Sequence, residues 1–351
     1  MSLVGLAARG ARRAIRAAGT ISKVPNAAAW PISLADALAA ERRIRPWVPE
    51  TPLRRYPTLD AAVGAGIAVY VKHENLAPTG SFKVRNAFAV LTALSPEDRR
   101  RGVVAATRGN HGLGVACAGA ALAIPVTVCV PRGNNPDKNA GMRGYGAELV
   151  EEGRDYDESV ETAARLSRER GLQIVHSTND PGVIAGAATV TLEALRAAPE
   201  LDALVVSVGG GSQAVGAMTV ARAWKPDLAV YGVQAEGAPA AHDSWHAGEP
   251  RPTTSADTFA DGLATRGVYD MTFEPMRRGL AGFVTVSDSE IAAALRLLLE
   301  TTHTLAEGAG AAGLAGLLSL RERLAGQRVG VVVSGANIDR ATLTRVLAGE
   351  L

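Results

Sequence analysis

The chain has little cysteine and almost no net charge. Its 351 residues include two cysteines, Cys117 and Cys129, which argues against a disulfide framework and indicates a reducing cytoplasm. Lysine and arginine number 37 against 35 acidic residues, so the formal net charge is +2. A charge this small provides no global field that would recruit nucleic acid or an anionic membrane, so a small-molecule partner fits the composition better.

The sequence also lacks a clear membrane-spanning segment. A long uncharged run, residues 115–131, approaches the length of a span but is rich in alanine and glycine and is interrupted by Pro125. We therefore predict a helix followed by a buried strand in this run. With 47% apolar and 21% charged residues the chain should fold as a globular protein, and its length suits two lobes.

Acidic residues are absent before Asp36, whereas four arginines lie among alanines between residues 9 and 16. This composition is shared with organelle transit peptides. We favour the alternative that residues 1–30 form an exposed N-terminal extension.

From about residue 66, short β-branched runs alternate with longer amphipathic stretches. This pattern indicates an α/β fold in which helices cover mostly parallel sheets. The strand candidates are IAVYVKHE, GVVAAT, PVTVCV, AELVEE, LQIVHS, DALVVSV, LAVYGVQA, GFVTVS and RVGVVVSG. The helix candidates include residues 82–94, 113–121, 155–169 and 288–301.

Polar breaks near residues 96–101 and 179–182 divide this pattern. They predict a small mobile lobe over residues 95–179, inserted into a large lobe formed by residues 31–94 and 180–351. The irregular segment 237–267 is either a loop beside the functional site or a surface excursion.

Four segments place polar or glycine residues directly after a predicted strand, where open α/β sheets bind ligands. They are TGSFKVRNA (79–87), ATRGNHGLG (106–114), VGGGSQAVG (208–216) and VVVSGANID (331–339). In the first segment, Lys83 would lie among apolar neighbours, which partly neutralises an amine as imine formation requires. Taken alone, a lysine at a helix start is much more often a solvated charge, and the surrounding residues are what favour the imine.

The glycine run from Gly209 to Gly211 leaves backbone amides free to wrap a phosphate at a helix N-terminus. Taken alone, it also suits a tight strand-to-helix turn. A dinucleotide site is a third possibility because Glu236 ends the next strand, but the spacing is not G-x-G-x-x-G. Asn110 and its neighbouring amides suit an anion, and Ser334 suits either a ring nitrogen or the cap of a turn.

Together and in this order, from about Pro52 to Ile338, the four segments resemble the fold-type II pyridoxal-phosphate enzymes, and within them the threonine and serine dehydratases. ADGLAT (260–265) and LAEGAGAAG (305–313) also have counterparts in that family. The resemblance implies that Lys83 forms a Schiff base with pyridoxal 5'-phosphate. It places Asn110 at the cofactor's ring oxygen and Ser334 at its pyridine nitrogen.

The resemblance also implies two sets of binding residues. The cofactor-binding set is Phe82, Lys83, Asn110, Gly209, Gly210, Gly211, Ser212, Gln213 and Ser334. The substrate-binding set is Ser81, Thr107, Arg108, Gly109, Asn110 and His111.

The chain departs from the family pattern at a few positions. Ser212 replaces the fourth glycine of the phosphate loop, which leaves the amides in place and adds a donor. Arg108 stands where serine racemases carry a serine that exchanges a proton, and a guanidinium cannot take one up. Arg108 therefore weighs against racemisation, and it either clamps a substrate carboxylate or points outward. Gln234 and Ala240 replace the acids that bind a divalent cation, so we expect no metal site.

The resemblance implies a lyase that removes water from a β-hydroxy amino acid such as L-threonine or L-serine, yielding a 2-oxo acid and ammonia. In this hypothesis Lys83 removes the proton from Cα, and a neutral Ser334 favours elimination over transamination. β-Replacement or racemisation is one alternative, and a non-catalytic ligand-binding module on the same fold is another. The resemblance also implies a homodimer.

Overall fold

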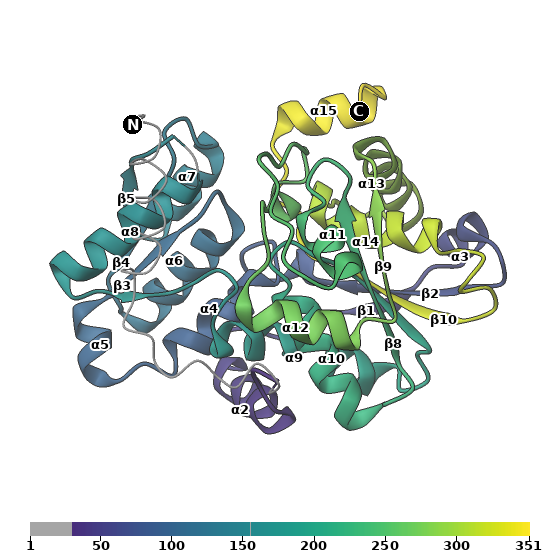
Figure 1. The fold of residues 1–351 in the computed structure, drawn as a ribbon, viewed down its shortest axis with the longest axis horizontal. Coiled ribbons are helices and arrows are strands. Elements are labelled where there is room, and N and C mark those ends of the chain that lie inside the picture. Colours follow the sequence, from purple (N-terminus) through teal and green to yellow (C-terminus); the bar gives the residue numbers. More distant parts are fainter. Residues whose placement is uncertain (1–29, 155) are drawn as a thin grey trace, which may run out of the picture.

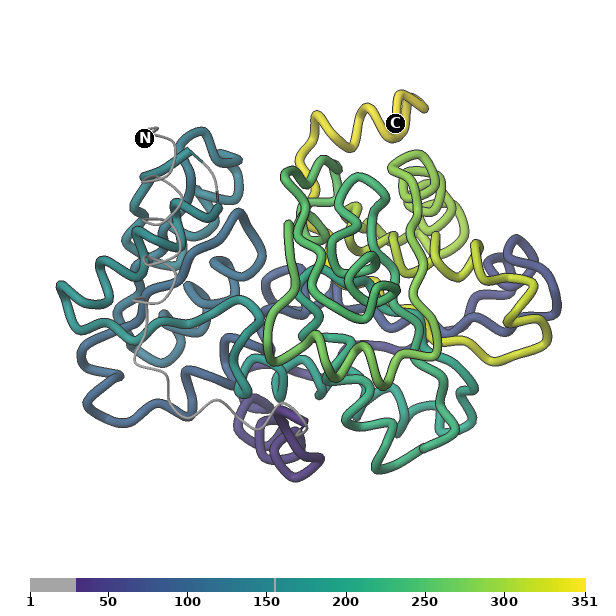
Figure 2. The backbone as a smooth tube through the Cα atoms, viewed as in Figure 1, coloured from purple at the N-terminus to yellow at the C-terminus, as the bar shows by residue number. Residues whose placement is uncertain are grey.

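The computed structural model describes residues 30–154 and 156–351, whose strands form two separate sheets (Figure 1). The N-terminal extension predicted over residues 1–30 lies outside the described residues except for Trp30. The strands β3 to β6 of the second sheet lie between α4 and α9 in the chain, and Figure 2 shows the blue-to-teal part of the chain forming a separate half of the molecule. The division into a fixed large lobe and a mobile small lobe remains a prediction.

The larger sheet has six strands in the order β1-β2-β10-β7-β8-β9. They are β1 (Leu53–Arg55), β2 (Ala68–His73), β7 (Ala203–Ser207), β8 (Ala229–Ala235), β9 (Gly282–Val286) and β10 (Arg328–Val333). All neighbours are parallel except β1, which pairs antiparallel with β2 at the edge. In the central register, Val331 lies between Val71 and Val205, and all three are buried. Such continuously apolar strands require helices on both faces.

Helices cover both faces of this sheet. On one face lie α2 (Leu34–Ile44), α9 (Pro181–Ala197), α10 (Ser212–Trp224) and α12 (Asp270–Gly279). On the other lie α3 (Pro57–Val63), α13 (Asp288–Thr302), α14 (Gly308–Ser319) and α15 (Arg340–Ala348). The shorter η1 (Glu74–Leu76), α11 (Ala240–Ala247) and η2 (Asp261–Leu263) lie in the connections. Capping boxes at Ser33 and Ser287 begin α2 and α13.

The smaller sheet has four parallel strands in the order β5-β4-β3-β6. They are β3 (Val103–Ala106), β4 (Val126–Val130), β5 (Glu148–Glu151) and β6 (Gln173–Ile174). Its helices are α5 (Pro96–Arg101), α6 (Asn110–Leu122), α7 (Pro136–Gly144) and α8 (Tyr156–Arg170). α6 and α7 pack beside β3, β4 and β5, whereas a separate apolar cluster joins α8 to β3 and β4.

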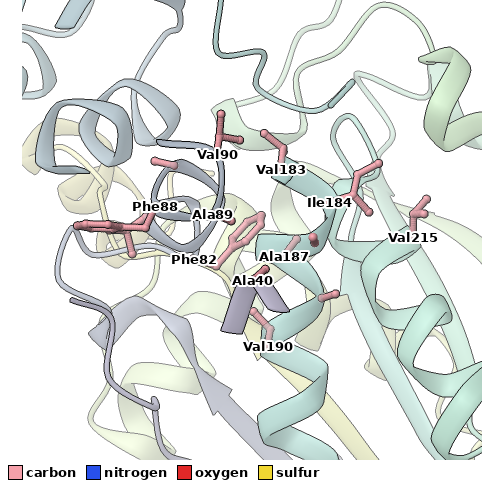
Figure 3. Close-up of a cluster of buried hydrophobic side chains, with 14 of the residues drawn as sticks. Ala40, Phe82, Phe88, Ala89, Val90, Val183, Ile184, Ala187, Val190 and Val215 are labelled. Atoms are coloured by element: carbon pink, nitrogen blue, oxygen red, sulfur yellow. The ribbon is translucent and has the colours of Figure 1, made fainter. Parts of the chain in front are cut away.

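The helix α4 (Lys83–Leu91) joins the two halves because it packs against both α6 and α9. Phe82 and Phe88 belong to one buried cluster that also contains Ile184 of α9 and Val128 of β4 (Figure 3). The two sheets therefore share a hydrophobic core around α4. Since Lys83 is the first residue of this helix, its backbone is held next to the core that the two sheets share.

The structure contains all nine predicted strands and confirms the α/β class with mostly parallel sheets. It adds β1, which the sequence analysis missed. Cys117 and Cys129 are both free, and the run 115–131 forms the end of α6 followed by β4, as predicted. Within the described residues, no helix is both long enough and apolar enough to cross a membrane.

Candidate active site

The carboxyl ends of strands from both sheets border one cavity of about 580 Å³. Segments after β2, β7 and β10 approach it from the larger sheet, and segments after β3, β4 and β6 from the smaller sheet. Its lining contains nearly all the residues predicted from sequence, namely Phe82, Lys83, Thr107, Arg108, Gly109, Asn110, His111, Gly209, Gly210, Gly211, Ser212, Gln213 and Ser334. This position between strand ends is typical of ligand sites in open α/β folds.

Lys83 points into this cavity from the first turn of α4. Its Nζ donates a hydrogen bond to the Ser177 carbonyl at 3.2 Å and lies 5.0 Å from the centre of the Phe82 ring. Burial lowers the pKa of Lys83 to about 8, and the negative charge of Glu307 opposes this shift. A much larger fraction of the amine is therefore neutral at pH 7 than in an exposed lysine, as nucleophilic attack on an aldehyde requires.

The segment that carries Lys83 is fastened to the segment that follows β10. The Phe82 amide donates to the Ser334 carbonyl at 3.0 Å, and Ser81 forms a backbone bridge with Gly335. Ser81 is fully buried and does not line the cavity, so its place in the predicted substrate-binding set remains a prediction without geometric support. The Ser334 hydroxyl donates to the Ala309 carbonyl at 3.2 Å.

The three consecutive glycines after β7 are required by close contacts. An ideal Cβ at Gly209 would lie 2.2 Å from the carbonyl oxygen of Gly262, and one at Gly210 would lie 2.2 Å from Thr178 Oγ1. Gly211 has φ +96°, which strongly favours glycine, and begins α10 as its N-cap. No larger residue fits these positions without moving a neighbour.

These glycines leave a row of free donors at the N-terminus of α10. Within the described part of the chain, the backbone N–H groups from Gly209 to Gln213 donate to no protein acceptor. The side-chain amide of Gln213 is also buried without a hydrogen-bond partner. Free amides at a helix N-terminus bind phosphate, so this loop fits the phosphate of pyridoxal phosphate.

Asn110 is held rigidly at the start of α6 by contacts with the other half of the molecule. Its Nδ2 donates to Glu307 Oε1 at 2.6 Å, and its Oδ1 accepts from Asn337 Nδ2 at 2.7 Å. Burial raises the pKa of Glu307, and the positive charge of Lys138 is the largest opposing influence. Glu307 is a site residue that the sequence analysis missed, although it lies within the quoted stretch LAEGAGAAG.

The turn from Thr107 to His111 presents a compact polar surface to the cavity. Thr107 Oγ1 accepts from the Gly109 amide at 2.9 Å, which tightens the turn. His111 Nε2 donates to the Val175 carbonyl at 2.9 Å, and burial together with the charge of Lys83 lowers the pKa of His111 to about 3. His111 is therefore neutral at pH 7. Arg108 is exposed at the cavity and has no ion-pair or hydrogen-bond partner among the described residues.

The irregular segment 237–267 is a loop beside the site, which settles the open alternative. Its residues 254–256 and 261–267 line the cavity. Two ion pairs join this loop to helices of the smaller sheet, namely Lys138 with Asp261 at 2.7 Å and Arg266 with Asp157. Asp261 lies within the quoted stretch ADGLAT, but none of these four residues was singled out from the sequence.

Gln234 occupies the place where a metal-binding acid was considered. Its Oε1 accepts from the Ala241 and His242 amides, at 3.0 and 2.9 Å, and so caps the N-terminus of α11. Among the described residues, three acids lie close enough together to hold an ion, and they are Glu41, Glu50 and Glu193. All three form ion pairs with Arg45, and none lines the cavity.

Comparison with known proteins agrees with this geometry. Residues 44–335 match the family described as pyridoxal-phosphate dependent enzyme. The chain is 39% identical over 316 residues to an L-threonine ammonia-lyase of Thermotoga maritima, covering 90% of this chain and 78% of the relative. It is 35% identical to an L-threo-3-hydroxyaspartate ammonia-lyase of a Pseudomonas species, covering 90% and 98%.

Among solved structures, maize serine racemase superposes with a TM-score of 0.86 at 29% identity, covering 92% of this chain and 98% of that one. The family match spans most of the chain, and the curated relatives exceed 30% identity over nine-tenths of it. The resemblance inferred from the sequence motifs is confirmed. The chain belongs to the fold-type II pyridoxal-phosphate dependent enzymes, and pyridoxal phosphate is its cofactor.

Proposed function

We propose that this enzyme eliminates water from a β-hydroxy amino acid such as L-threonine or L-serine and releases a 2-oxo acid and ammonia. The observation that carries the proposal is the placement of the Lys83 amine and the free amides of 209–213 around one cavity. The names of the relatives, L-threonine ammonia-lyase and L-threo-3-hydroxyaspartate ammonia-lyase, support the same reaction class.

The residues assigned to the cofactor follow four strands, namely β2, β3, β7 and β10. The amine of Lys83 would hold its aldehyde carbon, the 209–213 amides its phosphate, and Asn110 and Ser334 its ring. When bound, pyridoxal phosphate supplies an acceptor for the electron pair left at Cα. Ser334 offers a neutral hydroxyl instead of a carboxylate, which favours rapid loss of the β-hydroxyl over transamination.

Lys83 is also the group that would remove the proton from Cα. Because burial brings the pKa of Lys83 to about 8, its free amine accepts a proton readily near neutral pH. The turn from Thr107 to His111 would bind the substrate with its backbone amides and exclude water. Asn110, fixed by Glu307 and Asn337, would hold its orientation throughout the reaction.

Arg108 separates elimination from racemisation. Racemisation needs a second group that exchanges a proton on the face of Cα opposite the lysine, and a guanidinium stays protonated at any accessible pH. Arg108 lines the cavity, and the described part of the chain offers it no hydrogen-bond or ion-pair partner. We therefore assign it to substrate binding and not to proton transfer.

The test is a substrate panel with the purified holoenzyme. L-threonine, L-serine, L-threo-3-hydroxyaspartate and L-threo-phenylserine are incubated in turn, and 2-oxo acid, ammonia and the D-amino acid are measured separately. We expect 2-oxo acid and ammonia in equal amounts, no D-amino acid, and no turnover by Lys83→Ala. Lys225→Ala, a lysine outside the cavity, serves as the control.

Three outcomes would contradict the proposal. Formation of the D-amino acid without 2-oxo acid indicates a racemase. A requirement for an added thiol or other nucleophile indicates β-replacement. Absence of any turnover, with the cofactor bound, indicates a ligand-binding module.

We further propose a cytoplasmic homodimer in which the half containing residues 95–179 moves on ligand binding. The two free cysteines suit a reducing cytoplasm, the ion pairs between residues 254–267 and helices α7 and α8 are contacts that such a motion would change, and the homodimer rests on the family resemblance. Light scattering measures the mass, cell fractionation the location, and hydrogen exchange with and without substrate the motion. A monomer by light scattering, or exchange that substrate leaves unchanged over residues 95–179, would contradict them.

A further inference from the structure

Lys138 occupies a position that its own helix does not favour. It is the third residue of α7, and its amide donates to the side chain of the N-cap Asn135 at 3.1 Å. A cation in the first turn opposes the helix dipole, so helix stability does not explain this lysine. Its side chain is 10% exposed and lines the cavity, whereas lysines are ordinarily solvated.

The turn after β3 is shaped to admit this side chain. An ideal Cβ at Gly109 would lie 2.7 Å from Lys138 Cδ and 3.3 Å from its Nζ. Any side chain at this position would displace the ammonium group. The glycine therefore lets a positive charge lie directly over the turn from Thr107 to His111.

The charge of Lys138 acts inside the cavity. It is the largest influence that holds down the pKa of the buried Glu307, so its field reaches the Asn110 and Glu307 pair. Its Nζ donates to Asp261 Oδ2 at 2.7 Å across the cavity. An ammonium carries three donors, and two remain after this bond.

We propose that Lys138 binds the α-carboxylate of the amino-acid substrate, and that Asp261 is a positioning residue that holds the ammonium over the turn. The assignment rests on the proposed function only in taking the ligand to be an amino acid. An ammonium shielded from water binds a carboxylate more strongly than an exposed group does, because the local dielectric is lower. Arg108, which is exposed, then contributes at the mouth of the cavity.

The experiment measures binding of ligands that cannot lose a β-hydroxyl. The holoenzyme is titrated with glycine and, separately, with glycinamide, which has the amine but no carboxylate, and binding is followed by the change in cofactor absorbance. The variants are Lys138→Met and Lys138→Arg, with Lys225→Met as the matched control outside the cavity. Equal cofactor content and circular dichroism establish that each variant is folded.

We expect Lys138→Met to weaken glycine binding by about 10- to 100-fold, the usual loss for one hydrogen bond to a charged group, and to leave glycinamide binding unchanged. Lys138→Arg should restore most of the glycine affinity, and Lys225→Met should change neither ligand. Asp261→Asn should weaken glycine binding by less than Lys138→Met does. It should also increase the salt sensitivity of glycine binding, because the ammonium then lacks its protein carboxylate and attracts the ligand as an unneutralised charge.

Equal weakening of glycine and glycinamide by Lys138→Met would overturn the proposal, because it would make the lysine a structural link between the two halves. Unchanged glycine binding would overturn it as well. Should Lys138→Met fail to fold, Lys138→Gln and the arginine variant provide the same comparison. If the wild-type enzyme turns over no β-hydroxy amino acid but the glycine result holds, the proposed reaction fails while the carboxylate site stands.

Discussion

The environment of Lys83 predicts an unusual pH dependence for capture of the cofactor. Burial lowers the pKa of this amine to about 8, against an ordinary value of 10.5 for lysine. At pH 7 about one amine in ten would be neutral, compared with roughly three in ten thousand for an exposed lysine. Lys83 should therefore react with pyridoxal phosphate roughly 300-fold faster at pH 7 than its ordinary pKa would allow.

The assay uses the apoprotein mixed with excess pyridoxal phosphate between about pH 6 and pH 10. The rate of covalent capture should rise about tenfold per pH unit up to about pH 8 and then level off. Borohydride reduction followed by peptide mass spectrometry identifies the modified residue. Free lysine whose α-amine is blocked provides the control in the same buffers. The rate at which its side-chain amine reacts with pyridoxal phosphate should keep rising to about pH 10.

A second variant tests the cause of the shift. The charge of Glu307 raises the pKa of Lys83 and so opposes the effect of burial. Removing that charge with Glu307→Gln should lower the pKa of the lysine further, and the plateau should begin at a lower pH. A wild-type rate that still rises tenfold per unit above pH 9, or a plateau that Glu307→Gln moves upward, would refute the reasoning.

Two further changes should have separable effects. Gly210→Ala places a Cβ 2.2 Å from Thr178 Oγ1 and so distorts the loop. Equilibrium dialysis should show cofactor binding at least tenfold weaker, with an unchanged circular dichroism spectrum. Unchanged cofactor affinity would exclude this loop as the phosphate site. Arg85→Leu leaves the buried Glu193 without its bidentate partner, so urea unfolding should show a loss of about 3–5 kcal/mol. Arg328→Leu breaks an exposed pair that water screens, so its loss of stability should be much smaller. Equal losses for the two arginines would contradict the second prediction.

The central strands were predictable because their burial is nearly complete. A strand covered on both faces, such as β7 or β10, has a nearly continuous apolar sequence. β1 was missed because it has three residues, two of them exposed arginines, and pairs with a single neighbour at the edge. An edge strand pairs with a neighbour on one side only, so its sequence carries a weaker apolar pattern than that of a central strand.

Helix α14 could not be predicted from the helix propensity of its residues. Four of its twelve residues are glycines, which by themselves disfavour a helix. The structure gives the reason, since a Cβ at Gly316 would lie 2.1 Å from Val233 Cγ2 and one at Gly310 would lie 2.3 Å from the Gly335 carbonyl. The helix approaches the sheet so closely that tertiary packing overrides propensity, and this approach brings Glu307, its N-cap, to the cavity.

The predicted site residues share one property, which is that each lies in the connection that follows a buried strand. Lys83, Asn110 and Ser334 could therefore be placed at a sheet edge before their spatial relation was known. Glu307 and Lys138 could not, because each is recognised through a partner distant in the chain. Asn110 and Glu307 are separated by 197 residues, and nothing in a single sequence indicates that the two side chains are in contact.

Both of these unpredicted residues contact the other half of the molecule. Glu307 reaches Asn110 from the larger sheet, and Lys138 reaches Asp261 from the smaller one. A rigid shift of the smaller sheet would therefore change both contacts together, and with them the two polar groups that flank the turn from Thr107 to His111. A carboxylate bound by Lys138 and this turn would stabilise the position of the smaller sheet in which Asn110 is also aligned. Binding of the substrate and alignment of Asn110 would therefore be coupled through the smaller sheet.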